Sequence, residues 1–223
     1  MATDDTAGQD RKGIWLWTIF SAVTLFFLEF ILFAAFIPTN WARQVSETET
    51  RWLVEQQGEA SAQAIIGQAE GWYRTLFVDT DIAPWTYHIL APGKEVKVEA
   101  GWEGLAENQL WDWTRGRLNV LWGSFGQALQ RIALLLSWLP FLAILLVAAI
   151  GDGWIRRRIR RHSSAYASPL LHHSSVIGDL VLWVLITLLL LAPVPIPAVA
   201  VPIAFAASAV LVNLAVTNTQ KRL

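Results

Sequence analysis

Cysteine is absent from the 223-residue sequence, and charged residues are scarce at 16%. The lack of cysteine excludes disulfide bonds, a cysteine-based metal site and a thiol nucleophile. Hydrophobic residues make up 54% of the chain, the mean hydropathy is +0.41, and the apolar residues are gathered into long blocks. Such blocks are typical of membrane-spanning helices. The sequence therefore predicts an all-α integral membrane protein.

Recognisable catalytic motifs are also missing. The chain has no Walker A loop, no Gly-x-Ser-x-Gly elbow and no dinucleotide-binding fingerprint. Its histidines are His88, His162, His172 and His173. The adjacent pair His172 and His173 lacks the i, i+4 spacing that puts two metal ligands on one helix face, so both are interpreted as polar loop residues. We expect no enzymatic activity, no cofactor and no metal site.

The apolar runs predict four transmembrane helices. The first is residues 14–37, the second is residues 132–150, and residues 176–216 form a tight hairpin of two helices around Pro193 and Pro195. At about 1.5 Å per residue, about 20 residues cross an apolar layer of roughly 30 Å. Because the last two runs are short and contain prolines, a re-entrant hairpin is the main alternative. Pro140 predicts a kink in the second span.

A basic loop, DGWIRRRIRR at residues 152–161, follows the second span. Short arginine-rich loops beside membrane spans are retained in the cytoplasm, and Trp154 is suited to the headgroup level. This predicts a cytoplasmic loop at residues 151–175 and cytoplasmic tails at residues 1–13 and 217–223. These parts hold nine basic and four acidic residues, whereas residues 37–131 hold eight and twelve. The division supports an orientation with both termini in the cytoplasm.

Residues 38–131 are polar enough to lie outside the bilayer, and their pattern is mostly helical. One apolar stripe recurs at spacings of three and four, and it comprises Ala62, Ile65, Ile66, Ala69, Trp72, Tyr73 and Leu76. A second stripe comprises Trp111, Leu118, Trp122, Phe125, Leu129 and Ile132, and no helix breaker separates it from the second span. The opposite face of this second helix carries Arg117, Ser124 and Arg131 every seven residues, which predicts a solvated side.

Turn-forming residues mark the segment between these two helices. Residues 77–97 contain Asp79, Asp81, Pro84 and Pro92, so they are predicted to form a loop or turn, with a short strand at residues 96–98.

Aromatic residues are candidates for an external interface with another envelope protein, because such anchors concentrate at protein and membrane boundaries. The alternative for residues on the stripes is an aromatic core between the helices, whereas Trp85 and Trp102 lie off the stripes and favour an interface. The candidates are Trp72, Tyr73, Phe77, Trp85 and Trp102.

The arginine loop can bind anionic lipid headgroups or an acidic face of a cytoplasmic partner. The contact residues are Trp154, Arg156, Arg157, Arg158, Arg160 and Arg161. Direct nucleic-acid binding is not expected, because phosphate contacts by so small a cluster carry neither specificity nor sufficient affinity at physiological salt.

Two acidic residues fall inside apolar runs. Glu29 is either an ion or partner contact within the membrane or a protonated, hydrogen-bonded group that orients its helix. Asp179 lies near the start of the third span, and it is interpreted as a partner of the arginine loop.

Three stretches carry a resemblance to a known family. They are GWYRTLFVDTDI at residues 71–82, AAIGDGWIRRRIRRHSS at residues 148–164 and LLHHSS at residues 170–175. Their order resembles that of small inner-membrane proteins encoded by integrating conjugative elements and conjugative plasmids, over nearly the whole chain. The resemblance implies a bacterial inner-membrane location and a part in conjugative DNA transfer alongside the type IV coupling ATPase.

The leading hypothesis is a non-enzymatic inner-membrane component of a conjugative type IV secretion apparatus that contacts the coupling ATPase or another membrane protein of the apparatus. One alternative is a small transporter or channel subunit that uses Glu29 and Asp179. Another is an exclusion or structural envelope protein that acts through residues 41–131. Self-association of the chain is left open.

Overall fold

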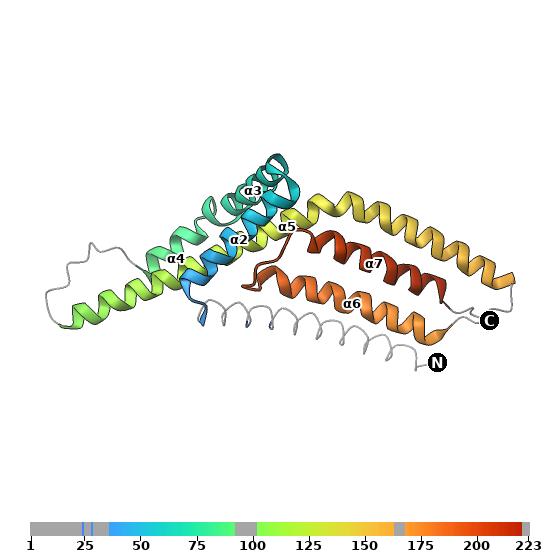
Figure 1. Ribbon diagram of the computed structural model, residues 1–223. Helices are drawn as coiled ribbons and strands as arrows, with labels where there is room; N and C mark the ends of the chain where they lie inside the picture. Colours follow the sequence, from blue (N-terminus) through green and yellow to red (C-terminus); the bar gives the residue numbers. More distant parts are fainter. Residues whose placement is uncertain (1–23, 25–27, 29–35, 92–101, 163–167, 220–223) are drawn as a thin grey trace, which may run out of the picture.

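The computed structural model describes residues 24, 28, 36–91, 102–162 and 168–219, although not the side chains of residues 102–110, 161, 162, 169 and 191. Within these residues the fold is all helical and contains no strand (Figure 1). The predicted strand at residues 96–98 and most of the predicted first span, including Glu29, lie outside the described residues. The helices are α2 (Thr39–Gln57), α3 (Glu59–Tyr73), the π-helical turn η1 (Arg74–Val78), α4 (Ile82–Leu90), α5 (Trp102–His162), α6 (Pro169–Leu191) and α7 (Ala200–Thr217).

Helix α5 is continuous over 61 residues and connects the two halves of the molecule (Figure 1). This confirms the prediction that the second helical stripe continues into the second span without a break. Pro140 lies inside α5 and has no N–H to donate to the preceding turn. Figure 1 shows that α5 changes direction along its length, rising through its green part and descending through its yellow part.

Three helices are long and apolar enough to cross a membrane, within the part of the chain that the structure describes. The candidate spans lie within Trp111–Arg160, Leu170–Leu190 and Ala200–Thr217. The latter two have 21 and 18 residues, which at about 1.5 Å per residue gives about 32 and 27 Å, close to the roughly 30 Å hydrocarbon layer. The length of α6 and α7 therefore suits a hairpin that crosses the membrane.

The C-terminal half of α5 packs with α6 and α7 into a three-helix bundle, in which α7 makes the most extensive contacts (Figure 1). Gly153 of α5 permits the close approach of α7, since a Cβ atom there would lie 3.1 Å from the backbone oxygen of Asn213 and 3.1 Å from Val216 Cβ. Beside it, the side-chain amide of Asn213 donates to the Ala149 carbonyl and to Asp152, each over 2.8 Å. The two helices are thus joined by a tight, hydrogen-bonded crossing.

Helices α2, α3 and α4, the turn η1 and the part of α5 before Arg131 form the second half, which we call the arm. Gly58, with φ +81°, separates α2 from α3. The arm shares one apolar core with the bundle, because Leu53 of α2, Ile65 of α3 and Phe205 of α7 belong to the same buried cluster. The arm and the bundle are therefore parts of one folding unit.

The predicted loop at residues 77–97 is wrong over residues 82–90, which form α4. Pro84 suggested a turn, but it occupies the third position of α4, where a missing N–H costs nothing because the first turn has no intrahelical acceptor for it. Asp81, with φ 59°, supplies the left-handed residue that reverses the chain before α4.

Substitution of Gly153 by alanine should destabilise the bundle. Alanine at an open helical position stabilises by about 0.5–1 kcal/mol relative to glycine, but overpacking costs about 1–3 kcal/mol. We expect Gly153→Ala to lower the thermal unfolding temperature in mild detergent. Gly151→Ala is the matched control, since nothing lies within 4 Å of its added Cβ. Equal unfolding temperatures for the two variants would contradict the tight crossing.

Candidate functional site

The first candidate site is the basic end of the bundle, where α5 ends, α6 begins and α7 ends (Figure 1). Its arginines are not equivalent. Arg156 and Arg158 are exposed, whereas Arg157 and Arg160 are half-buried. The Arg160 guanidinium donates to Asn218 Oδ1 over 3.0 Å, which fastens the last turn of α5 to the end of α7.

The exposed arginines are held by residues of α5 itself. Arg156 Nε lies 2.8 Å from Asp152 Oδ2, one turn earlier. The Arg158 guanidinium carbon lies 5.2 Å from the centre of the Trp154 ring, which is 55% exposed. A guanidinium stacked on an indole face is attracted by the ring quadrupole. The result is an outward-facing surface of two arginines and a tryptophan, while the side chain of Arg161 is not described.

The histidines belong to a helix rather than to a loop, which corrects their interpretation from the sequence. Helix α6 begins at Pro169, and Ser168 caps it by accepting a hydrogen bond from the Leu171 N–H over 3.4 Å. Proline at the first helical position and serine at the cap are favoured there. His172 Nδ1 lies 2.8 Å from the Ala215 carbonyl of α7, and His173 is exposed.

Asp179 is bound to α7 and not, as expected, to the arginine loop. Its Oδ1 accepts a hydrogen bond of 2.7 Å from Ser208 Oγ, and both residues lie where α6 faces α7. Asp179 therefore links α6 to α7 within the bundle.

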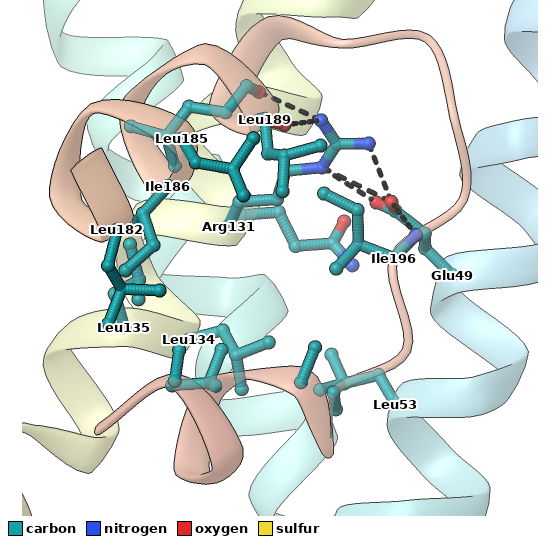
Figure 2. Close-up of a pocket in the computed structure, with 16 residues that line it drawn as sticks. Glu49, Leu53, Arg131, Leu134, Leu135, Leu182, Leu185, Ile186, Leu189 and Ile196 are labelled. Atoms are coloured by element: carbon teal, nitrogen blue, oxygen red, sulfur yellow. Dashed lines mark hydrogen bonds and ion pairs between the residues drawn. The ribbon is translucent and has the colours of Figure 1, made fainter. Parts of the chain in front are cut away.

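The second candidate site is a buried ion pair where the arm meets the bundle (Figure 2). Arg131 of α5 lies 2.6 Å from Glu49 of α2, and their side chains are only 8% and 6% exposed. Glu49 also accepts from the Gln127 amide over 2.9 Å and from the Ile196 N–H over 2.8 Å. Burial of a charge is costly unless it is paired and fully hydrogen-bonded, and this pair meets both conditions.

Arg131 also binds the chain that joins α6 to α7. Its guanidinium donates to four backbone carbonyl oxygens, those of Leu189, Leu190, Ala192 and Val194. The last carbonyls of a helix have no intrahelical partner, so Arg131 satisfies groups at the end of α6 that hydrocarbon could not. Trp41 Nε1 donates to the Pro193 carbonyl over 2.8 Å, and Gln56 accepts from the Val199 N–H over 2.8 Å. The connection is therefore fixed by α2 and α5.

These contacts show that the predicted solvated face of Arg117, Ser124 and Arg131 was wrong. Helix α2 and Ile37, which precedes it, lie against this face: Arg117 Nη1 donates to the Ile37 carbonyl over 2.8 Å, and Arg131 pairs with Glu49 of α2. A seven-residue repeat of polar residues fits a solvated face, but it fits equally well a face whose polar groups are paired with another segment. The signal that could have identified Arg131 is its position directly before an apolar run, where an arginine needs a partner.

Tyr73 and Phe77 lie in an aromatic cluster within the arm. The Phe77 ring centre is 5.5 Å from that of Tyr73 and 5.2 Å from those of Trp122 and Phe125. Trp122 Nε1 donates to Thr86 Oγ1 over 3.0 Å, which attaches α4 to α5. Burial raises the pKa of the Tyr73 phenol above its usual value. A contact of these residues with another protein remains a prediction.

Trp72 also faces inward, against the shared core, whereas α4 presents an apolar stripe outward. Ile82, Trp85 and Ile89 are 48%, 62% and 50% exposed, and their spacing of three and four puts them on one side of α4. The side chain of Trp102 is not described. No group of three or more potential metal ligands is brought together in the part of the chain that the structure describes.

These features define a helical membrane protein with an arginine-rich end and a large helical arm. A model of the family described as IncC plasmid conjugative DNA transfer protein DtrJ-like matches residues 33–223. The chain belongs to this DtrJ-like family of conjugative DNA transfer proteins. Searches of curated proteins and of solved structures found no match.

Removal of the Glu49 charge should destabilise the protein strongly. Glu49→Gln leaves Arg131 buried without its counter-ion, and breaking a buried pair costs about 3–5 kcal/mol. The control is Glu47→Gln on the same helix, where the Arg43–Glu47 pair is 3.7 Å apart and largely exposed, and we expect a cost below about 1 kcal/mol. Thermal unfolding in detergent measures the difference. A similar loss in both variants would show that the buried pair does not stabilise the junction.

Proposed function

We propose that this chain is a non-enzymatic inner-membrane component of the conjugative type IV secretion apparatus and that its basic end binds the coupling ATPase. Membership of a conjugative DNA transfer family supports a role in conjugation. The observation that carries the proposal further is the exposed surface formed by Trp154, Arg156 and Arg158 at the end of α5.

The anchoring of the neighbouring residues makes this surface suitable for recognition. Arg160 is bound to Asn218, and Asp152 accepts from both Arg156 and Asn213, so the end of α5 is fixed on α7. A fixed surface loses little conformational entropy when a partner binds. Tryptophan and arginine are also the residues most enriched in energetically important protein contacts. An acidic face of the ATPase would complement the two guanidinium groups.

The orientation that the arginines predict would bring this surface to the compartment of its proposed partner. Arginine-rich segments beside a span are retained in the cytoplasm, where an ATPase finds its nucleotide. Anionic lipid headgroups are the competing ligand for the same arginines, each worth about 1 kcal/mol near the surface. Lipid binding and protein binding give different results in the following experiment.

The test replaces both exposed arginines in cells that carry the complete mobile element. Arg156→Gln with Arg158→Gln should lower the frequency of DNA transfer about tenfold or more, equivalent to at least about 1.4 kcal/mol of contact. A photocrosslinker at Trp154 should capture the coupling ATPase in the parent chain and not in the double variant. The control is Arg43→Gln with Arg51→Gln, which removes two exposed arginines from the arm.

Normal transfer by the double variant, at the same protein level and topology, would refute the ATPase contact. Crosslinking of lipid alone from Trp154 would refute it as well and would assign the surface to membrane headgroups.

The exposed stripe of α4 supports a second contact, with another protein of the apparatus. Helix α4 is attached to α5 through Arg115, Asn119 and Trp122, which lie nine to sixteen residues before Arg131, or about 14–24 Å along the helix. With the second span at residues 132–150, as the sequence predicts, the stripe lies outside the hydrocarbon layer. Exposed apolar stripes of this kind mark interaction sites.

Substitution of Trp85 should separate this contact from folding. Trp85→Ala should reduce DNA transfer while leaving the unfolding temperature unchanged, because the ring is 62% exposed. Trp122→Ala is the comparison, since truncation of a buried tryptophan costs about 3–5 kcal/mol. If Trp85→Ala transfers DNA as well as the parent chain, α4 makes no contact that transfer requires.

A further inference from the structure

A cavity of about 180 Å³ lies between α5, α6 and α7 at the end of the bundle that meets the arm (Figure 2). It is lined on three sides by apolar side chains, with the Arg131–Glu49 pair at one end. The apolar lining residues are Leu53, Leu134, Leu135, Leu182, Leu185, Ile186, Leu189, Leu190, Ile196, Ala198, Ala200, Val201 and Ala204.

The polar end of the cavity has no binding capacity left for a charged ligand. All three guanidinium nitrogens of Arg131 donate within the chain: Nε to both Glu49 oxygens, Nη1 to carbonyls at the end of α6, and Nη2 to Glu49 and Val194. Both Glu49 oxygens accept from more than one donor. An anionic headgroup would find no free donor on the ion pair, and Gln130 is the one other polar side chain of the lining, so the cavity favours apolar ligands.

Water is also a poor occupant. A buried water needs two to four polar partners, and besides the saturated ion pair the lining offers only the side chain of Gln130. Apolar cavities of about 150 Å³ lined by leucine, isoleucine and phenylalanine stay dry and bind small hydrocarbons. The lining of this cavity has the same chemistry.

The cavity opens toward the outside of the bundle. Leu185 lines it and is nevertheless 50% exposed. Helices α5 and α6 contact each other much less extensively than each contacts α7. Among the helices that the structure describes, none closes the space between α5 and α6 over its full length. The neighbouring outward residues Leu180, Val184 and Ile203 are apolar and exposed, as on a surface that faces hydrocarbon. An opening surrounded by exposed apolar side chains suits an apolar ligand that enters from the hydrocarbon layer.

We propose that this cavity binds an acyl chain of a membrane phospholipid, which enters between α5 and α6 and ends beneath the Arg131–Glu49 pair. The bound acyl chain fills the cavity and packs against Leu134, Leu182 and Leu185, whose side chains would otherwise face empty space. The site involves neither the basic end of the bundle nor the coupling ATPase, so it stands apart from the proposed function.

The test uses the full chain in nanodiscs that contain phosphatidylethanolamine with a diazirine on its acyl chain. After illumination, mass spectrometry should place adducts on the cavity residues Leu134, Leu182 and Leu185. Ala204→Phe fills the cavity and should lower this labelling about tenfold, as expected when a ligand loses its space. The matched control is Ala206→Phe on the same helix, because Ala206 is exposed and does not line the cavity.

Labelling that falls only on outward residues such as Leu180 and Val184, or that is equal in the parent chain and Ala204→Phe, would overturn the proposal. The chain has no cysteine, which permits a second measurement of the occupant. If single cysteines within residues 14–37 form disulfides with Leu185→Cys while Leu134 and Leu182 remain unlabelled, a segment of the chain itself fills the cavity and the proposal is wrong. Each variant is compared with the parent chain by its unfolding temperature, and only variants with an unchanged value are used, so that a loss of labelling does not reflect misfolding.

Discussion

The Arg131–Glu49 pair holds the molecule together at the place where its two halves meet. Neither charge is tolerable alone in a site that is more than nine-tenths buried, and each satisfies the other while also binding backbone groups. The pair joins α2 to α5, and both residues also bind the connection between α6 and α7. It therefore holds these elements in place relative to one another. The apolar core around Leu53 and Phe205 surrounds the same point.

Helix α5 extends the effect of this junction to both ends of the protein. Its 61 residues correspond to about 90 Å at about 1.5 Å per residue, and they carry the aromatic cluster of the arm, the buried arginine and the exposed arginine surface on one backbone. Since α7 is fastened to α5 at Gly153 and Arg160, the basic end is not a loose tail. The arm and the basic end are therefore parts of one continuous helix.

The sequence predicted the helices better than it predicted the contacts between them. Long apolar runs identified the spans of α5, α6 and α7, and a helical stripe correctly predicted that Ala62, Ile65 and Ala69 are buried. The predicted loop around Pro84 was wrong, because a proline in the first turn of a helix cannot be distinguished by sequence from a proline in a loop. The ion pair could not be derived, since periodicity shows that Arg131 and Arg117 share a face but not that α2 covers it. The cavity depends on side-chain packing between three helices and leaves no pattern in the sequence.

The connection between α6 and α7 has a consequence for how the protein is made. The carbonyl groups at the end of α6 receive their hydrogen bonds from Arg131, and the N–H of Ile196 finds its acceptor in Glu49, on helices synthesised much earlier. Without those helices, these backbone groups of the hairpin would lack their hydrogen-bond partners. The hydrogen bonds of this connection therefore form only where α2 and α5 already lie together, so the polar backbone of the hairpin is completed by the arm.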